Sequence, residues 1–270
     1  MAACSPWVLA ACALLAAATP AHAQRTLPAR ASGYGYAQSQ SPAADCAYQF
    51  VDIGASGAPL LLLAAGAAPA QDDGAAVVAL EQSFEFHGEA RDTIVLSSNG
   101  YLAFADALAA EAGGDFSNDC PMPALPDNAP SVAARIAALH DELDGGAGGT
   151  VHARYFPQCP RPGAADGLPE ACTVLQWSAW PRLGSVVPND FQVLLYHATQ
   201  AIVLQYAQVD PLVMASASIG LQSDDGADAA LWSCNGERSL APASAVCFYD
   251  PRFPPGERPD GLYADGFETP

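Results

Sequence analysis

The sequence predicts an all-β protein: a single antiparallel β-sandwich, stapled by disulfides, with a disordered N-terminal leader and a disordered C-terminal tail. Three observations predict this fold class. Short β-prone runs recur along the chain and are separated by Gly, Pro, Asn and Asp, which is the spacing of sandwiches and barrels. The chain begins with the pattern of an export signal, and an even number of cysteines follows it, as in proteins that form disulfides in an oxidising compartment.

Residues 1–23 have the pattern of a signal peptide. An apolar stretch over residues 7–18 is followed by Pro20 and by the small-residue triplet AHA at 21–23, a typical cleavage site. LAAC at residues 9–12 resembles a lipoprotein processing box, so a lipidated Cys12 is the alternative. No later segment has the roughly 20 apolar residues of a spanning helix. We therefore expect no transmembrane segment and a secreted, periplasmic or cell-surface location.

The rest of the chain divides into three parts. Residues 24–45 are rich in Ala, Gly, Ser, Gln and Pro without a hydrophobic period, and we expect a flexible leader. Residues 46–250 form the predicted sandwich domain, and residues 251–270, rich in Pro and Gly, form the predicted tail. The β-prone runs are residues 48–53, 83–87, 93–97, 101–104, 150–156, 173–180, 190–197, 201–208, 216–222, 230–234 and 246–249.

Local sequence patterns give additional support to some of the predicted strands. Asn99-Gly100 lies between two β-prone runs, and this dipeptide favours the two positive φ angles of a type I′ hairpin turn. Apolar residues alternate on both sides of a turn within residues 190–208, which predicts an antiparallel hairpin with one buried face. Residues 131–143 (SVAARIAALHDEL) differ, because their Ala content and Ser131 as an N-cap predict a helix by intrinsic propensity.

Cys4 and Cys12 fall within the signal peptide, and the remaining cysteines are Cys46, Cys120, Cys159, Cys172, Cys234 and Cys247. Sequence alone leaves their pairing open among many connectivities. Spacing along the chain favours first a bridge between the two cysteines that flank a Pro- and Gly-rich stretch. It favours next the other pair that is close in sequence, and the two cysteines that remain form the third pair. The resulting pairs are Cys159 with Cys172, Cys234 with Cys247, and Cys46 with Cys120. A zinc site is the competing hypothesis, but the chain has no C-x-x-C pair.

The formal net charge is −19, from 29 acidic residues against 10 basic residues, all of them Arg. Such a surface repels nucleic acid and anionic membranes, keeps the protein soluble and attracts divalent cations. Two loops, 140–146 and 224–228, place carboxylates beside Gly, which suits calcium, although tight turns use the same residues. The candidate calcium ligands are Asp141, Glu142, Asp144, Asp224, Asp225 and Asp228, and no other cofactor is expected.

Catalytic motifs are absent from the sequence, which contains no G-x-S-x-G, H-E-x-x-H or S-x-x-K. A dispersed catalytic triad needs only spatial proximity, so the histidines to place are His87, His140, His152 and His197. Trp177 and Trp180 are three residues apart on one predicted strand, so their side chains point to opposite faces of the sheet. At least one of them therefore faces away from the side on which Leu175 lies. That tryptophan either fills the core or contacts a glycan or protein ligand.

Seven segments in order resemble the motifs of one known family. FEFHG at 84–88 is like F-x-F-Y-G, IVLSSNGYLAF at 94–104 is like V-x-V-S-S-N-G-Y-L-S-F, and RIAALHDELD at 135–144 is like I-A-P-F-W-D-D-L-D. The others are residues 174–177, 190–196, 202–206 and 218–222. Together they resemble the nidogen-like (NIDO-type) extracellular β-sandwich of basement-membrane proteins and of many exported bacterial proteins.

This resemblance implies a strand at residues 135–143 despite their Ala content. His87 and His140 stand where the family has aromatic residues. The family is associated with cell–matrix adhesion, so the resemblance implies an exported, non-enzymatic binding or adhesion module with an extracellular protein or glycan ligand. The alternative is an exported hydrolase or an accessory subunit of a secreted hydrolase. DGFE at 265–268 resembles an ending of exported bacterial proteins.

Overall fold

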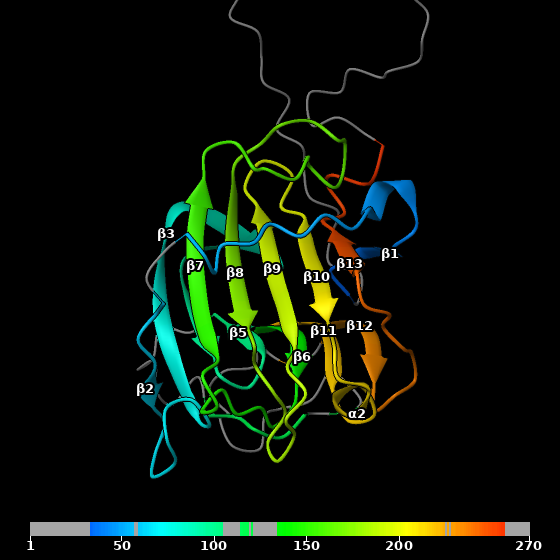
Figure 1. Cartoon of the computed structure of the whole chain (residues 1–270). Helices are drawn as coiled ribbons and strands as arrows, with labels where there is room; N and C mark the ends of the chain where they lie inside the picture. Colours follow the sequence, from blue (N-terminus) through cyan, green and yellow to red (C-terminus); the bar gives the residue numbers. More distant parts are fainter. Residues whose placement is uncertain are drawn as a thin grey trace, which may run out of the picture. The chain divides into compact units, whose positions relative to one another are not determined.

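The computed structural model describes residues 33–56, 59–104, 114–118, 120, 134–224, 226 and 228–256. These residues form two stacked antiparallel β-sheets, which confirms the predicted sandwich (Figure 1). The predicted signal peptide, the start of the leader and the DGFE ending lie outside the described residues. The helices in the described part of the chain are too short to cross a membrane.

Thirteen strands and two short helices make up the described fold. The first sheet has the order β1 (Ala37–Gln40), β13 (Ser244–Tyr249), β10 (Ile202–Gln208), β9 (Asp190–Tyr196), β8 (Cys172–Ser178) and β7 (Thr150–Phe156). The second has the order β12 (Ala229–Cys234), β11 (Ser218–Gln222), β6 (Arg135–His140), β5 (Tyr101–Ala103), β4 (Glu89–Ser97), β3 (Gly74–Phe86) and β2 (Leu63–Ala64). The 3-10 helix η1 (Ala44–Cys46) and helix α2 (Pro211–Met214) lie in connections.

The β9–β10 hairpin confirms the period of two in the sequence. Leu204 pairs with Val193 and Tyr206 with Phe191, and all four are buried between the sheets. Trp177 of β8 stacks on Phe191 with ring centroids 4.7 Å apart. Burying side chains of this size contributes about 2–3 kcal/mol each, so this layer dominates the core.

Both tryptophans of the β8 region are buried. Ala179 has a φ of 51°, which breaks the alternation after Trp177 and turns Trp180 back into the same core. Their indole nitrogens donate to the carbonyls of Ser97 at 2.9 Å and Ser98 at 2.7 Å. The interpretation of these tryptophans as core residues is confirmed.

The hairpin at Asn99-Gly100 is confirmed, but its predicted turn type is wrong. Gly100 has a φ of 75°, whereas Asn99 does not have the positive φ that a type I′ turn needs. The Asn99 side-chain oxygen instead accepts from the main chain of Leu143 at 3.0 Å, which holds Asn99 inside the fold. The paired positive φ angles occur one hairpin earlier, at His87 (49°) and Gly88 (81°), between β3 and β4.

The helix predicted from propensity within residues 131–143 is wrong, and the strand implied by the family resemblance is present as β6. All six residues of β6 are buried, and the strand is paired on both edges, with β5 and with β11. Small Ala side chains fit this crowded central position. Pairing in the sheet therefore overrides the helical propensity of the segment.

Residues 48–53 were predicted as a strand but pair with neither sheet. They cross the outer face of the first sheet, in front of β10, β9 and β8 in Figure 1. Their main chain is held by buried glutamine side chains. Gln205 accepts from Gln49 at 2.7 Å, and Gln176 accepts from Ile53 at 2.8 Å.

The predicted flexible leader, residues 24–45, needs correction over its second half. Ala37–Gln40 forms β1, which pairs with β13. This segment has no apolar pattern, because backbone hydrogen bonds rather than buried side chains hold it. The predicted tail also begins later than expected, since Arg252 forms two hydrogen bonds of 2.8 Å with Asp250 and Gly256 donates to Ala165 at 2.7 Å.

All six cysteines beyond the predicted signal form disulfides. The bridge between Cys159 and Cys172 is the pair that spacing favoured. The other two predicted pairs are wrong: the bridges are Cys46 with Cys247 and Cys120 with Cys234. Strands distant in sequence lie side by side in this topology, so the nearest cysteine along the chain is not the nearest in space.

Candidate functional site

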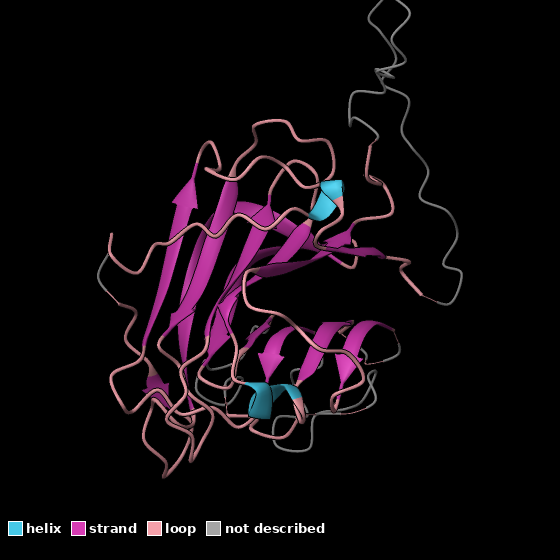
Figure 2. Cartoon of the chain, turned by 45° about the vertical axis from the view of Figure 1, so that its right-hand side comes forward, coloured by secondary structure: helices cyan, strands magenta, loops and turns pink. Residues whose placement is uncertain are grey.

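The two lateral sides of the sandwich differ. On one side, residues 60–64 connect the sheets, because Leu60 donates to Val151 of β7 at 2.8 Å and Leu63 pairs with Ala75 of β3. On the other side the last strands are β1 and β12, which belong to different sheets. Figure 2 turns this second side towards the viewer. We call the space between β1 and β12 the edge groove.

Side chains bridge the edge groove at two points. The Gln38 amide nitrogen donates to the Leu231 carbonyl at 3.3 Å, and the Trp232 indole nitrogen donates to the Gln40 side-chain oxygen at 3.2 Å. From the first contact to the second, the residue number rises on both strands, from Gln38 to Gln40 and from Leu231 to Trp232. The strands β1 and β12 therefore run in the same direction on either side of the groove.

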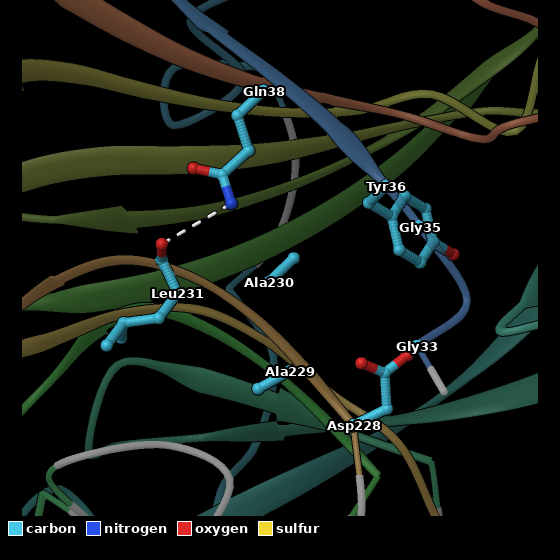
Figure 3. Close-up of a pocket in the computed structure, with 8 residues that line it drawn as sticks. All are labelled: Gly33, Gly35, Tyr36, Gln38, Asp228, Ala229, Ala230 and Leu231. Carbon is cyan, nitrogen blue, oxygen red and sulfur yellow. Dashed lines mark hydrogen bonds between the residues drawn. The ribbon is translucent and has the colours of Figure 1, made fainter. Parts of the chain in front are cut away.

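Two pockets lie along the edge groove. The first, about 380 Å³, is shown in Figure 3 and is lined by Gly33, Gly35, Tyr36, Gln38, Asp228, Ala229, Ala230 and Leu231. The second, about 500 Å³, is lined by residues that include Gln40, Tyr48, Trp232, Leu240 and Ala245. Each volume suits a few side chains or sugar rings of a ligand.

An aromatic cluster surrounds Tyr36, which lines the first pocket. The rings of Tyr34 and Tyr36 lie 5.0 Å apart, and the His87 ring lies 5.3 and 5.1 Å from them. His87 Nδ1 is 3.6 Å from an Asp228 carboxylate oxygen, and Asp228 also accepts from the Tyr34 main chain. Asp228 is therefore anchored, with its carboxylate in the pocket wall.

A charged network stabilises the segment before β1. The Tyr34 hydroxyl donates to Asp250 at 2.6 Å, and Arg252 binds both Asp250 and Glu85. Burial, followed by the bond to Asp250, raises the pKa of Tyr34 well above its ordinary value. This network ties the segment to β13 and β3.

The predicted calcium ligands that the structure describes do not converge on one site. Residue 135 of β6 lies opposite residue 222 of β11, and residue 140 lies opposite residue 218, so the loops after β6 and β11 leave opposite ends of this strand pair. Asp141 contacts Arg182 and Ser216, and Asp144 accepts from Gly146 in a tight turn. Asp224 pairs with Arg91.

Asp225 lies outside the described residues, and no side-chain contact of Glu142 supports a metal. The described residues contain no group of three or more His, Cys, Asp or Glu side chains positioned for a metal ion. Calcium binding stays a prediction.

The four histidines have separate environments. His87 is part of the aromatic cluster described above. His140 lies against the Asp115 carbonyl at 3.1 Å, His152 against the Thr150 hydroxyl at 3.1 Å, and His197 against the Thr173 hydroxyl at 2.9 Å. These partners are a backbone carbonyl and two threonines, so the contacts give no support to a serine or cysteine hydrolase.

A second polar cluster lies on the outer face of the second sheet. Arg135 and Asp115 form a buried ion pair of 2.8 Å, and the guanidinium lies over the Tyr101 ring. Burial, followed by the Arg135 charge, lowers the pKa of His140 to about 4. All four side chains of the cluster are buried.

Sequence reasoning missed the β1 half of the edge groove. One signal was available: Tyr34 and Tyr36 alternate with glycine in an otherwise aromatic-free leader, which is a strand-like spacing. Gln38 and Gln40 carry no such signal, because polar residues on an edge strand have the composition of a loop.

Comparison with known families gives one match. A family model described as NIDO related matches residues 43–247, which is most of the chain. The match includes β12 and the greater part of both sheets, whereas β1 precedes it. No curated protein and no solved structure matches the chain.

Proposed function

Because the chain belongs to the NIDO-related family, we propose that it is an exported, non-enzymatic module that binds an extracellular protein or glycan in the edge groove. The family and the three disulfides support an extracellular location, since such bridges persist in oxidising compartments.

The open side of the sandwich is the observation that carries this proposal. At the closed side residues 60–64 connect the two sheets, whereas at the open side two pockets lie along the edge strands β1 and β12. Concave surfaces with a few convergent polar groups and an aromatic wall are the usual form of binding sites. Here Gln38, Asp228 and Tyr36 supply these groups.

A groove-filling variant tests the proposal. Ala230 lines the first pocket, so Ala230→Trp should fill the pocket while leaving the β11–β12 ladder intact. Leu212→Trp adds the same side chain on α2, at a position that is 67% exposed and outside the groove. Retention of the labelled purified protein on immobilised cell-envelope and extracellular-matrix fractions is then measured for each variant.

We expect the parent protein and Leu212→Trp to be retained equally and Ala230→Trp to bind about tenfold more weakly. Thermal unfolding of Ala230→Trp establishes that the variant is folded. Equal retention of all three proteins would contradict the groove as the site. Release of soluble fragments from the fractions would contradict the non-enzymatic part of the proposal.

A further inference from the structure

We propose that the ligand of the edge groove is an extended, basic polypeptide segment that adds to β1 as a further strand of the first sheet. This inference rests on the proposed function and names the class of partner. Three features carry it: the direction of the free main-chain groups, the unprotected edges and the charge.

The main-chain groups of Gln38 point away from β13. Ser41 donates to the Ala245 carbonyl at 3.0 Å, in the same register that pairs Ser39 with Cys247. Hydrogen-bonded and non-hydrogen-bonded pairs alternate along an antiparallel ladder. Gln38 is therefore in a non-hydrogen-bonded pair, with its N–H and carbonyl directed to the open side.

The main-chain groups of β12 alternate in the same way. Ser223 donates to the Asp228 carbonyl at 2.9 Å, and the register continues to Leu221 opposite Ala230. By alternation, the main-chain groups of Leu231 face away from β11. The contact between its carbonyl and the Gln38 amide agrees with this direction. Both edges thus direct main-chain groups to the open side. Those of Gln38 on β1 are the ones that a further strand can pair with, since the Leu231 carbonyl already accepts from the Gln38 side chain.

Among the described residues, neither edge strand contains a charged side chain or a proline, although β1 is short and is followed by Pro42. Natural edge strands are blunted by charged side chains, by proline or by covering segments. β1 has the sequence AQSQ and β12 the sequence AALWSC, without a charged residue or proline in either strand. The closed side of the sandwich, by contrast, is covered by residues 60–64. The open edges are therefore suited to a partner strand.

A strand that pairs with β1 would direct alternate side chains towards the pockets. The first pocket presents Ala229, Ala230 and Leu231, so small apolar side chains of the partner fit on this face. The opposite face of the partner strand stays at the surface.

Charge favours a basic partner over a second copy of this chain. The protein has a formal net charge of −19, so two copies repel each other, whereas a cationic segment is attracted. Asp228 lies in the first pocket and Asp45 accepts from Ser39 of β1 at 3.0 Å. Two cations lie beside the second pocket, Arg238 over the Trp232 ring and Arg161 bound to the Ala47 carbonyl, so the basic side chains of the partner should gather near the first pocket.

Backbone-modified peptides test strand addition without altering the protein. The probe is a capped, fluorescent octapeptide of alternating lysine and valine. Two further peptides carry N-methyl groups on alternate residues, one on the lysines and one on the valines. Because a strand donates from alternate residues to one neighbour, one methylated peptide should bind about tenfold more weakly and the other about as well as the parent peptide.

A protein variant gives an independent readout. Gln38→Pro removes the outward N–H without removing a β1–β13 hydrogen bond, and Gln38→Ala removes only the side chain. Both variants lose the Gln38 side chain that lines the first pocket, so their difference isolates the main-chain N–H. We expect folded Gln38→Pro to bind the peptide at least tenfold more weakly than Gln38→Ala. Equal effects of both methylation patterns, or full binding by folded Gln38→Pro, would overturn the inference.

The two proposals fail in different ways. If Ala230→Trp abolishes retention on the extracellular fractions but the octapeptide does not bind, the groove is a binding site and the partner class is wrong. Groove-dependent binding of an uncharged oligosaccharide would also show that the partner class is wrong. If Ala230→Trp leaves retention unchanged, the proposed function itself fails.

Discussion

Gln49 and Gln205 exchange two hydrogen bonds of 2.7 Å, the main chain of Gln49 with the side-chain amide of Gln205. Gln205 lies beside Gln192, which lies beside Gln176, so three glutamines form a row across β10, β9 and β8. The Gln192 amide can bond both main-chain groups of Val51, at 2.8 and 2.9 Å, in the orientation that satisfies it. The side-chain amides of this row therefore bond the main chain of residues 49–53, as the backbone of a neighbouring strand would.

Loss of one glutamine should therefore destabilise the fold. We expect Gln205→Ala to lower the free energy of unfolding by about 1–3 kcal/mol, because it leaves main-chain groups of Gln49 without partners. Gln208→Ala, at an exposed position of the same strand, should change it by less than about 0.5 kcal/mol. Denaturant unfolding compares them, and equal stabilities would contradict the structural role of the row.

The disulfides should differ in how much each contributes to the free energy of unfolding. Cys46 and Cys247 are 201 residues apart, whereas Cys159 and Cys172 are 13 apart. A longer closed loop restricts the unfolded chain more, so removing the first bridge by double alanine substitution should cost roughly 2 kcal/mol more than removing the second. Guanidinium unfolding under non-reducing conditions measures both variants.

Peptide mapping of the unreduced protein checks the pairing itself. A peptide that joins Cys46 to Cys247 is expected, and one that joins Cys234 to Cys247 would contradict the structure.

His140 should make the stability depend on pH. Its folded pKa is about 4, below the ordinary value of 6.5, so the unfolded chain binds more protons between these values. The stability contribution of neutral His140 is complete above about pH 6.5 and is lost as the pH falls towards 4. His140→Phe should flatten the slope of unfolding free energy across this window. An unchanged slope would show that other groups cause it.

The Asn99-Gly100 turn should tolerate no side chain at its glycine. A Cβ on Gly100 would lie 2.2 Å from the Leu139 carbonyl oxygen, and the φ of 75° adds strain. Gly184 has a φ of 76° but open space around its Cα, so Gly184→Ala measures the strain alone. Gly100→Ala should cost several kcal/mol and Gly184→Ala about 1 kcal/mol, both by thermal unfolding. Similar costs would show that the turn relaxes to accept a methyl group.

Part of the fold was predictable because short β-prone runs separated by turn residues mark several of its strands. β7 matches the predicted run 150–156, and β9 and β10 match within a residue at each end. β6 was predictable only from the family resemblance, since its Ala content favours a helix in isolation. β2 and the first half of β3 were not predicted, because β2 has only two residues and Val77 and Val78 of β3 stand among Gly and Ala residues without a clear period of two.

The candidate site was less predictable than the fold. β1 is held by its backbone, and backbone pairing leaves no apolar pattern in the sequence. Residues 48–53 do have a strand pattern, but their partners are side chains of three glutamines that are distant in sequence. The edge groove arises from the places where each sheet ends, which only the complete topology determines.

Amide hydrogen exchange at Gln38 tests the account most directly, with Ser39 as its internal reference. In the free protein the Gln38 amide should exchange rapidly and the Ser39 amide slowly, because only Ser39 donates within the β1–β13 ladder. Saturating lysine–valine octapeptide should slow exchange at Gln38 and leave Ser39 unchanged. A Gln38 amide already protected in the free protein, or one unaffected by the bound peptide, would contradict the account.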